Sequence, residues 1–450
     1  MRGENAVVVG AGMAGLFAAQ VLADFYEEVT VIERDSLPST ASPRGGAPQG
    51  RHLHVLLSRG LLAIGELFPG LVDDLVAAGV PGGDLLATGR MYFNGFRLTR
   101  TYGDLPILGV TRPYLEWRIR GHLAARRNVR IVSSCAASGL LLTSAGESVI
   151  GVRVDSGHDQ VPDGVLAADL VVDASGRRSA LPRWLLEAGY APPVEERVEI
   201  DLAYASWYVH AEPDLLEGDL GLAVGTTPEV PAGGALARVQ GGQWLVSLTG
   251  YRGWHPPTTV QDCLTFARHL PVPDLFDVLR HTTPVQPPVR YRVRQAMRRR
   301  FERLRRFPDG LAVIGDALCS FNPVYGQGMS VAAVQALALR TFLRGNGRPT
   351  PSLRTTMARA NAVAWAMSVG SDLRMPWIDN RRTVSVRVGN AYVDRVLRTA
   401  QDDPVVARAF MRVASLVQSP SSLARPNVAM RVLARPARSF RRDKPAVANR

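Results

Sequence analysis

Residues Glu4 to Asp35 read ENAVVVGAGMAGLFAAQVLADFYEEVTVIERD. An apolar strand leads into a GxGxxG turn, an apolar helical stretch follows, and a second strand runs up to the acid Glu33. The glycines of the turn are Gly10, Gly12 and Gly15. Strand, glycine turn, helix and strand in this order open a doubly wound α/β domain.

The glycine turn predicts a dinucleotide site. Glycines permit a tight turn and a close approach of the backbone, so the following helix directs its free N–H groups at a pyrophosphate. An acid at the end of the second strand can accept hydrogen bonds from a ribose. The predicted cofactor residues here are Gly10, Gly12, Met13, Ala14, Gly15, Glu33 and Arg34.

A second loop of the same character lies about three hundred residues later, in GDALCSFNPVYGQGMS, Gly315 to Ser330. Leu311 to Ile314 predict a buried strand, so the Asp316 carboxylate is expected at the carboxyl end of that strand, where open α/β sheets bind ligands. The loop glycines permit the backbone to approach a flat ring, and a helix from about Met329 directs its N-terminus at an anion such as a reduced flavin.

Composition restricts the class of protein. At 450 residues the chain predicts two or three domains. The net charge of +13 comes almost entirely from arginine, since Lys444 is the only lysine, and the basic clusters at 298–307 and 435–444 are compatible with an acidic protein partner. No nucleic-acid motif accompanies the charge. The glycines that interrupt the apolar N-terminal run argue against a membrane span or a signal peptide.

Cysteine usage predicts neither a disulfide framework nor a metal site. The three cysteines lie far apart without metal-ligand spacing, and their number is odd: Cys135, Cys263 and Cys319. We therefore expect no metal and a cytoplasmic location.

The order of the patterns predicts a Rossmann-like domain interrupted by a mostly antiparallel substrate domain. Asn94-Gly95 and Gly241-Gly242 each predict a two-residue hairpin, and apolar residues alternate between Val198 and Tyr208 as in a half-buried strand. The expected division is a cofactor domain of 1–75, 105–195 and 295–348, a substrate domain of 76–104 and 196–294, a helical region of 349–433 and a disordered basic tail of 434–450.

Three motifs in order, GAGMAG, DASGRRS (Asp173 to Ser179) and GDALCSFNPVYGQGMS, resemble those of single-component FAD-dependent monooxygenases related to para-hydroxybenzoate hydroxylase. The resemblance spans roughly Ala6 to Leu343. Within that superfamily, RGGAPQGRHLHVLL, DASGR, FNPVYGQGMS and the C-terminal WAMSVGSDLRMPW are most similar to bacterial polyketide olefin epoxidases of antibiotic biosynthesis.

The resemblance implies roles for individual residues. Arg44 would approach the pyrophosphate or ribityl chain of FAD, Arg112 would lie beside the cofactor, and Asp316 would bind the ribityl chain. Asp173 and Gly176 match the middle motif only with Ala-Ser inserted between them. The residues implied around Asp316 and the isoalloxazine ring are Gly315, Asp316, Pro323, Gly326, Gln327, Gly328, Met329 and Ser330.

No catalytic side chain is assigned. His52 and His54 are weak candidates for a general base, since the resemblance places their loop near the reactive edge of the flavin, although histidines on loops are more often packing residues. The aromatic residues of the second sheet are expected to pack in its core: Trp207, Tyr208, Trp244 and Trp254.

The resemblance implies an oxidoreductase in which NAD(P)H reduces FAD, O2 gives a hydroperoxyflavin, and an alkene of an apolar, polyketide-like metabolite is epoxidised. An acidic carrier protein or a separate flavin reductase would be its partner, with neither nucleic acid nor membrane involved. Three alternatives stay open: an aromatic hydroxylase, a flavin-dependent double-bond reductase and a non-enzymatic basic binding protein. A halogenase would need a lysine beside its substrate, and Lys444 is the only one.

Overall fold

The computed structural model describes residues 2–155, 160–161, 163–212, 214–345 and 352–434. Among them, no helix combines the length and the apolar character needed to cross a membrane.

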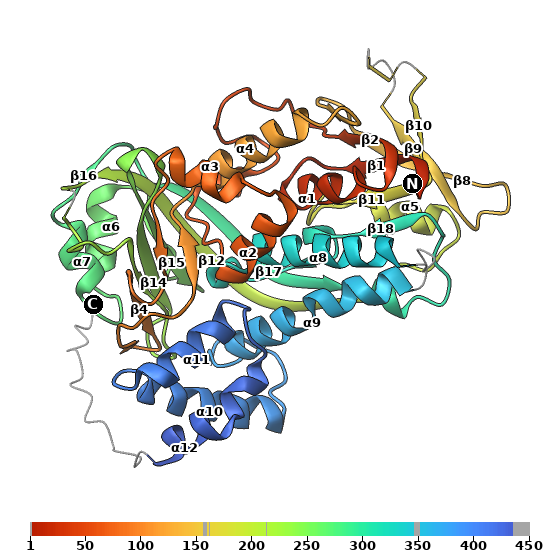
Figure 1. Ribbon diagram of the computed structural model, residues 1–450. Helices are drawn as coiled ribbons and strands as arrows, with labels where there is room; N and C mark the ends of the chain where they lie inside the picture. Colours follow the sequence, from red (N-terminus) through yellow and green to blue (C-terminus); the bar gives the residue numbers. More distant parts are fainter. Residues whose placement is uncertain (1, 156–159, 162, 213, 346–351, 435–450) are drawn as a thin grey trace.

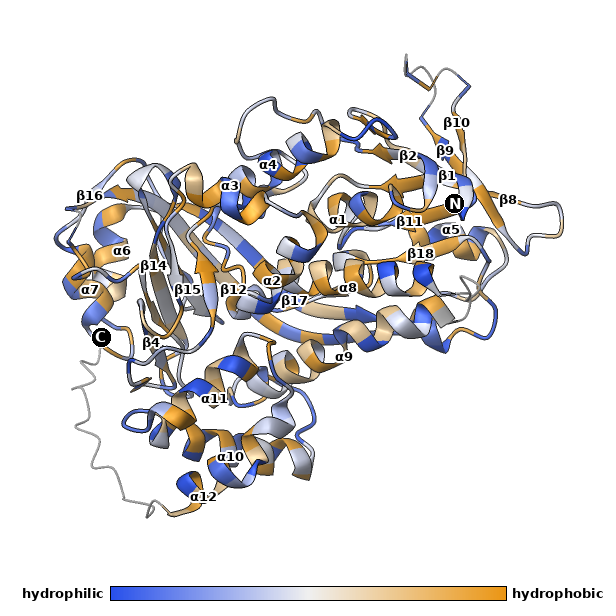
Figure 2. Cartoon of the chain, viewed as in Figure 1, coloured by the Kyte–Doolittle hydropathy of each residue, from blue (hydrophilic) through white to orange (hydrophobic). Residues whose placement is uncertain are grey.

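A five-stranded parallel sheet forms the centre of one half of the molecule (Figure 1). Its order is β18-β11-β1-β2-β7. The strands are β1 (Gly3–Val9), β2 (Tyr26–Ile32), β7 (Val129–Val132), β11 (Leu170–Asp173) and β18 (Leu311–Val313). The apolar runs of β1, β2, β11 and β18, hydrophobic in Figure 2, are buried, as expected for parallel strands that are covered on both faces, whereas β7 at the sheet edge is only partly buried. Val9, Ile32, Asp173 and Val313 lie in register at the carboxyl edge, where the predicted cofactor loops begin.

Helices and a small sheet cover the parallel sheet. Helix α8 packs against α1, α2 and α9, and α4 packs against α1 and β7. The helices of this half are α1 (Met13–Leu22), α2 (Ser58–Leu67), α3 (Leu71–Ala77), α4 (Arg112–Ala124), α5 (Leu181–Glu187) and α8 (Gln327–Arg344). A three-stranded antiparallel sheet contacts β1 and β11. Its strands are β8 (Ala137–Leu142), β9 (Val149–Val154) and β10 (Val165–Ala167).

A larger sheet of nine strands forms the other half, and all its pairs are antiparallel except β4 with β13. Its strands are β4 (Gly89–Phe93), β5 (Phe96–Arg97), β12 (Glu195–His210), β13 (Gly221–Val224), β14 (Ala232–Arg238), β15 (Trp244–Tyr251), β16 (Thr283–Pro284), β17 (Val289–Arg299) and β19 (Cys319–Ser320). A two-stranded sheet pairs β3 (Gly82–Asp84) with β6 (Pro106–Leu108). One face of the large sheet is covered by α6 (Val260–Ala267) and α7 (Asp274–Leu279), which close an apolar core with Trp207 and Trp244.

Four helices end the described chain: α9 (Ser352–Asp372), α10 (Val384–Thr399), α11 (Pro404–Ala414) and α12 (Pro426–Ala434). The observed architecture therefore confirms the predicted fold class. Helix α12 includes Ala434, so the predicted tail begins at least one residue later, and 435–450 lie outside the described residues. The exact domain boundaries remain a prediction.

The predicted hairpins differ in their accuracy. Asn94 and Gly95 form the two-residue connection between β4 and β5, both at positive φ. The prediction was wrong at the second site, where three residues, Gln240 to Gly242, lie inside a Val239 to Gln243 hydrogen bond. Two glycines at positive φ fit either loop length, so their presence did not determine it.

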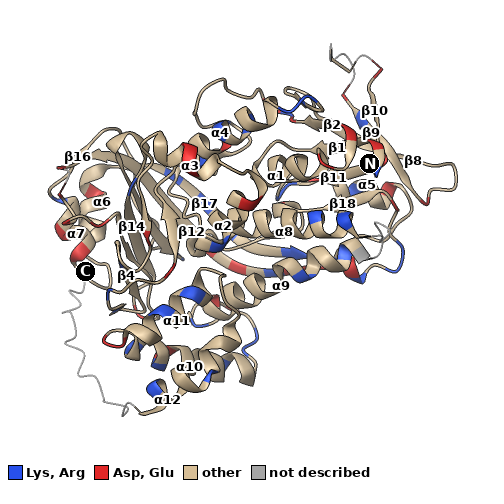
Figure 3. Ribbon diagram, viewed as in Figure 1, with Lys and Arg blue, Asp and Glu red and all other residues tan. Residues whose placement is uncertain are grey.

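Two expectations about side chains also need correction. Trp254 is exposed rather than packed in the sheet, because it follows β15 on a turn with Gly253 at positive φ. The predicted basic cluster at 298–307 spans the end of β17 and the segment after it (Figure 3). Its first residues are not available on the surface for an acidic partner. Arg298 and Arg299 are buried, and the Arg299 guanidinium pairs with Glu195 at 3.0 Å.

Candidate cofactor and substrate site

The first glycine loop is shaped by the close approach of backbone to backbone. Gly10 has φ of +104°, and a Cβ there would lie 2.7 Å from the Ala174 carbonyl oxygen. A Cβ at Gly15 would lie 1.8 Å from the Gly10 carbonyl oxygen, so only glycine fits. Gly12 caps α1, which has no acidic residue in its first turn and no side-chain cap. The N-terminus of the helix is therefore open to an anion.

Two guanidinium groups converge on this N-terminus. A Cβ built on Gly12 would have Arg44 Nη2 at 3.8 Å and Arg112 Nη2 at 3.9 Å as its nearest neighbours. The Arg112 Nε is buried and has no hydrogen-bond partner. The tight turn at Gly10 and Gly15, a bare helix N-terminus and two converging guanidinium groups fit a pyrophosphate, and thus the dinucleotide end of FAD.

Glu33 and Arg44 lie together in a buried carboxylate cluster. Glu33 Oε2 accepts a hydrogen bond from the Ala11 amide (2.9 Å) and lies 3.1 Å from Arg44 Nη1. The same guanidinium bonds to Asp35 and, through Nε at 3.0 Å, to Glu116 of α4. Glu33 thus braces the turn, and a ribose would share its carboxylate. Arg34 instead points outward and is largely exposed, at 3.9 Å from Asp35.

Asp316 follows β18, as predicted, and faces two arginines. Burial raises the pKa of its carboxyl, while the positive charges of Arg112 and Arg177 act to lower it. Arg112 therefore joins the two loops, with its guanidinium near Gly12 and within electrostatic reach of Asp316. Gly315, at φ of +62°, lies so close to Ala14 that a Cβ there would be 2.5 Å from the Cβ of Ala14.

The second glycine loop uses its backbone rather than its side chains. Pro323 begins a 3-10 turn, and Gly326 at φ of +65° caps α8. Gly328 has open space around it, whereas Met329 and Ser330 point into the protein. The Ser330 hydroxyl accepts a hydrogen bond from the Leu57 amide at 3.1 Å. A flat ring would therefore contact the backbone of this loop and Gly328.

The DASGRRS segment is organised by its own acid. Asp173 is buried, and its carboxylate accepts hydrogen bonds from the Ser175 amide (3.0 Å), the Ser175 hydroxyl and the Ser179 hydroxyl (both 2.5 Å). Burial raises the pKa of Asp173, and these bonds oppose the rise. Gly176 has φ of +84° in open space. The carboxylate thus holds the loop that carries Arg177, and any contact of Asp173 with FAD remains a proposal.

The two histidines lie between the glycine loops and the large sheet. His52 Nδ1 is 2.9 Å from the Ser206 hydroxyl, and its ring packs edge-on against Tyr204. His54 Nδ1 lies 3.0 Å from the His52 carbonyl oxygen. Burial lowers the pKa of His52 to about 4 and that of His54 to about 3, with Arg112 adding to the second shift. Both are therefore neutral at pH 7 and weak as bases.

A row of small residues crosses the sheet face that carries Tyr204. Ser206 of β12, Ser247 of β15, Ala235 of β14 and Ala223 of β13 lie in register, and Ser206 donates a hydrogen bond to Ser247 at 2.9 Å. Ala235 and Ala223 are partly exposed although they lie on interior strands. The opposite face of the same strands carries the large core residues, so the face beside His52 is the one lined by small side chains.

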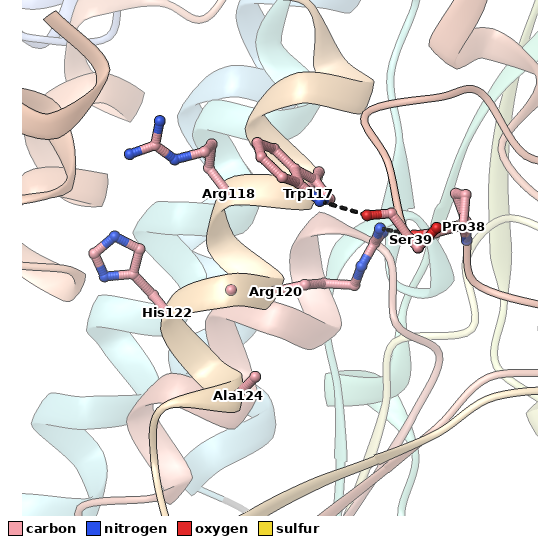
Figure 4. A pocket seen from close by; sticks show the side chains of 8 residues that line it. Pro38, Ser39, Trp117, Arg118, Arg120, His122 and Ala124 are labelled. Carbon is pink, nitrogen blue, oxygen red and sulfur yellow. Dashed lines mark hydrogen bonds between the residues drawn. The ribbon is translucent and has the colours of Figure 1, made fainter. Parts of the chain in front are cut away.

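The outer side of α4 carries a separate, open hollow of about 470 Å³ (Figure 4). The Trp117 indole donates to the Ser39 carbonyl (2.8 Å) and the Arg120 guanidinium to the Pro38 carbonyl (2.7 Å). The hollow holds none of the predicted site residues, so we do not assign it to the cofactor.

The sequence patterns missed several residues that complete the site. Glu116 and Asp35 hold Arg44, Arg177 faces Asp316, and the Gln335 side chain accepts the Gly315 amide at 2.7 Å. Arg177 lies inside a quoted motif and could have been found there. The others are ordinary helix and loop residues, and only their position in space identifies them.

Comparison with known proteins agrees with this geometry. Residues 5–43 match the model of the pyridine nucleotide-disulphide oxidoreductase family. Protein Rv3254 of Mycobacterium tuberculosis is 34% identical over 437 residues, covering 92% of this chain and 90% of that protein. The chain belongs to the family of Rv3254.

Two further proteins are similar to this chain over most of its length. Kynurenine 3-monooxygenase of Salinispora tropica is 27% identical over 402 residues, covering 80% of this chain and 76% of the enzyme. The solved structure of p-nitrophenol 4-monooxygenase PnpA from Pseudomonas putida superimposes with a TM-score of 0.61 at 18% identity, covering 93% of this chain and 98% of that one. The chain has the FAD-dependent monooxygenase fold, and the predictions of an enzyme and of FAD agree with these similarities.

Proposed function

We propose that this chain is an FAD-dependent monooxygenase that transfers one atom of O2 to an apolar small molecule. The observation that carries the proposal is the convergence of three remote segments on Arg112: the α1 N-terminus at Gly12, the Asp316 carboxylate and the histidine loop. Gly10, Gly12, Gly15 and Arg44 would hold the pyrophosphate, and Asp316 the ribityl chain.

When bound, FAD supplies the oxygen chemistry, with electrons from a nicotinamide. The chain's own residues would bind, orient and dehydrate the reactants. The N-terminus of α8, which has no acidic residue in its first turn, would favour negative charge on the reduced ring. The small row from Ser206 to Ala223 would leave space for an extended apolar substrate, with the serine hydroxyls to orient a polar group on it.

Within this class we propose alkene epoxidation as the reaction. The π bond of an alkene is itself the nucleophile, whereas a phenol reacts faster when a base removes its proton. His52 and His54, the titratable candidates beside the small row, have pKa values lowered by burial to about 4 and 3, so neither is a strong base. The balanced reaction converts alkene, O2, NAD(P)H and a proton into epoxide, water and NAD(P)+.

Isotope labelling tests the proposal. Purified protein should show the visible spectrum of bound flavin. With NAD(P)H and labelled oxygen gas, a panel of extended polyketide-like alkenes should yield a product that carries one labelled oxygen and none from labelled water. The Asp316→Ala variant should make no product unless FAD is present in large excess.

Other outcomes distinguish the alternatives. A labelled hydroxyl group on an aromatic ring would assign the chain to the hydroxylases. A product that gains two hydrogens without oxygen would assign it to the double-bond reductases. Protein that neither carries nor binds a flavin would contradict the enzyme class and favour a basic binding protein.

A further inference from the structure

A buried carboxyl group lies behind the second glycine loop. Asp372, the last residue of α9, is 1% exposed. Its Oδ1 accepts hydrogen bonds from Asn322 Nδ2 (2.7 Å) and from the Tyr325 hydroxyl (2.8 Å). Its Oδ2 is buried and has no hydrogen-bond partner. A buried, unpartnered carboxylate oxygen is costly, which favours the protonated acid.

The two donors stand at the ends of a short turn that leads into α8. Asn322 caps the 3-10 turn by accepting the Val324 amide at 3.2 Å, and Tyr325 immediately precedes Gly326, the N-cap of α8. Asn322 also donates to the Tyr251 hydroxyl of β15 at 2.9 Å. One carboxyl group from the C-terminal helical region therefore ties down the turn that would face the flavin ring.

Helix α8 also contacts the start of the same loop, at Gly315. Helix α9 packs along α8, and Gln335 of α8 accepts the Gly315 amide next to Asp316. Asn361, Ser368 and Asp372 recur on one side of α9, and each has a buried polar atom without a partner. Buried polar atoms without partners thus recur along α9 up to Asp372, on a helix that packs against α8.

No cation neutralises Asp372 among the charged groups described around it. The Arg374 guanidinium pairs with Asp394 of α10, and the Arg382 guanidinium donates to the carbonyl groups of Leu373, Met375 and Ile378. Tyr251 and Tyr325 are phenols whose pKa values are raised by burial, so they stay neutral. Burial raises the pKa of Asp372 to about 7, against the lowering effect of the bonds from Asn322 and Tyr325.

We propose that Asp372 is a positioning residue whose protonated form holds the Asn322 to Gly326 turn in place for the flavin ring. This assignment rests on the proposed function. Because the folded form binds the proton more tightly than the unfolded chain does, the stabilisation is present at low pH and is lost as the pH rises through about 7. Ionisation strengthens the two hydrogen bonds that Oδ1 accepts, but it also places charge on the buried, unpartnered Oδ2, and opening of the turn is favoured because it lets water reach that charge.

The test compares wild type with Asp372→Asn. The amide oxygen accepts the same two hydrogen bonds but cannot ionise. The Kd of FAD for the wild type should rise about tenfold between pH 6 and pH 8, and the melting temperature of the wild type relative to that of Asp372→Asn should fall over the same range. The Kd of FAD for Asp372→Asn should be nearly independent of pH. The control variant Asp379→Asn, which alters an exposed acid seven residues away, should behave as wild type.

Tyr325→Phe provides a second variant if Asp372→Asn folds poorly. Loss of the phenol removes a bond that lowers the pKa of Asp372, so the midpoint of both pH profiles should move upward. An unchanged midpoint would overturn the role of Asp372. FAD binding that follows pH identically in wild type and Asp372→Asn would overturn the positioning role alone. Protein that binds no FAD at any pH would overturn the proposed function and the positioning role with it.

Discussion

The two glycine loops of this chain resemble one another in sequence but are held in place by different means. At Gly10 and Gly15 the contacts that exclude any side chain are made with the backbone of the same loop and of the neighbouring strand end at Ala174. The second loop rests on segments far away in sequence. Gly326 packs against Val55, and the Ser330 hydroxyl accepts the Leu57 amide.

The difference shows that one part of the site is held mainly by local contacts and the other part by contacts with distant segments. Apart from its contact with the backbone at Ala174, the first loop is specified by roughly thirty residues of continuous sequence, so its geometry should survive most changes elsewhere. The second loop depends on the histidine segment 52–57 and on α9. Changes in those remote elements should therefore alter the flavin ring site while leaving the pyrophosphate site intact.

Gly15→Val should have the largest effect. Its Cβ would lie 1.8 Å from the Gly10 carbonyl oxygen, and backbone cannot move aside as a side chain can. We expect more than about 3 kcal/mol of destabilisation and no flavin binding. Denaturant unfolding and flavin content measure both effects. Gly121→Val, at an exposed helical position with open space, is the control and should change stability by less than about 0.5 kcal/mol. Normal FAD binding by Gly15→Val would mean that the first loop is not the pyrophosphate site.

His52 should give the segment beneath the second loop a pH dependence. Burial lowers its pKa from 6.5 to about 4, so the stability it contributes is present above pH 6.5 and is lost as the pH falls towards 4. The loss amounts to about 3 kcal/mol for a shift of this size. Denaturant unfolding of wild type and His52→Gln at pH 7 and pH 4 measures it. The variant should lose less stability on acidification, and equal losses would contradict the burial of a neutral imidazole.

Asp316→Ala should weaken FAD binding while the fold persists. A hydrogen bond to a charged group contributes about 1.5–3 kcal/mol, so the Kd should rise roughly tenfold to a hundredfold. Titration of flavin into the purified variant measures this change. Asp309→Ala, which replaces an exposed acid before the same strand, should bind FAD as the wild type does. Retention of wild-type affinity by Asp316→Ala would remove Asp316 from the ribityl site.

Ser330→Ala should have the smallest effect. It tests most directly whether loss of a second-loop contact changes stability without changing FAD binding. Its hydroxyl is used by the Leu57 amide, so removing it should cost about 1 kcal/mol of stability. The Kd of FAD should stay within about twofold, since the hydroxyl does not face the loop surface and the contacts with Val55 and Asp372 still hold the loop. A stable variant with greatly reduced FAD affinity would show that Ser330 contacts the flavin directly, as the motif resemblance implied.

The sequence by itself determined the first loop, the buried strand before Asp316 and the existence of a strand at Val198 to Tyr208. That strand is not half-buried throughout as predicted, since it bulges at Asp201 and is buried on both faces from Leu202 to Trp207. Each of these three features is a local pattern, in which the spacing of glycines or apolar residues is set by the geometry of one turn, strand or helix. The sequence also predicted that Asp316 follows the end of a strand, because the apolar run before it stops where β18 ends.

Only the tertiary structure decided which side chains meet. Arg44 reaches Glu116, 72 residues away, and Asp372 reaches Asn322, 50 residues away, in pairs that no local spacing indicates. The same holds for the neutral state of His52, which depends on its burial against Tyr204 and Ser206 rather than on its own sequence neighbours. The protonation state and the hydrogen-bond partners of a buried side chain depend on all the residues packed around it. Those residues are distant in the sequence, and the periodicity of strands and helices does not indicate them.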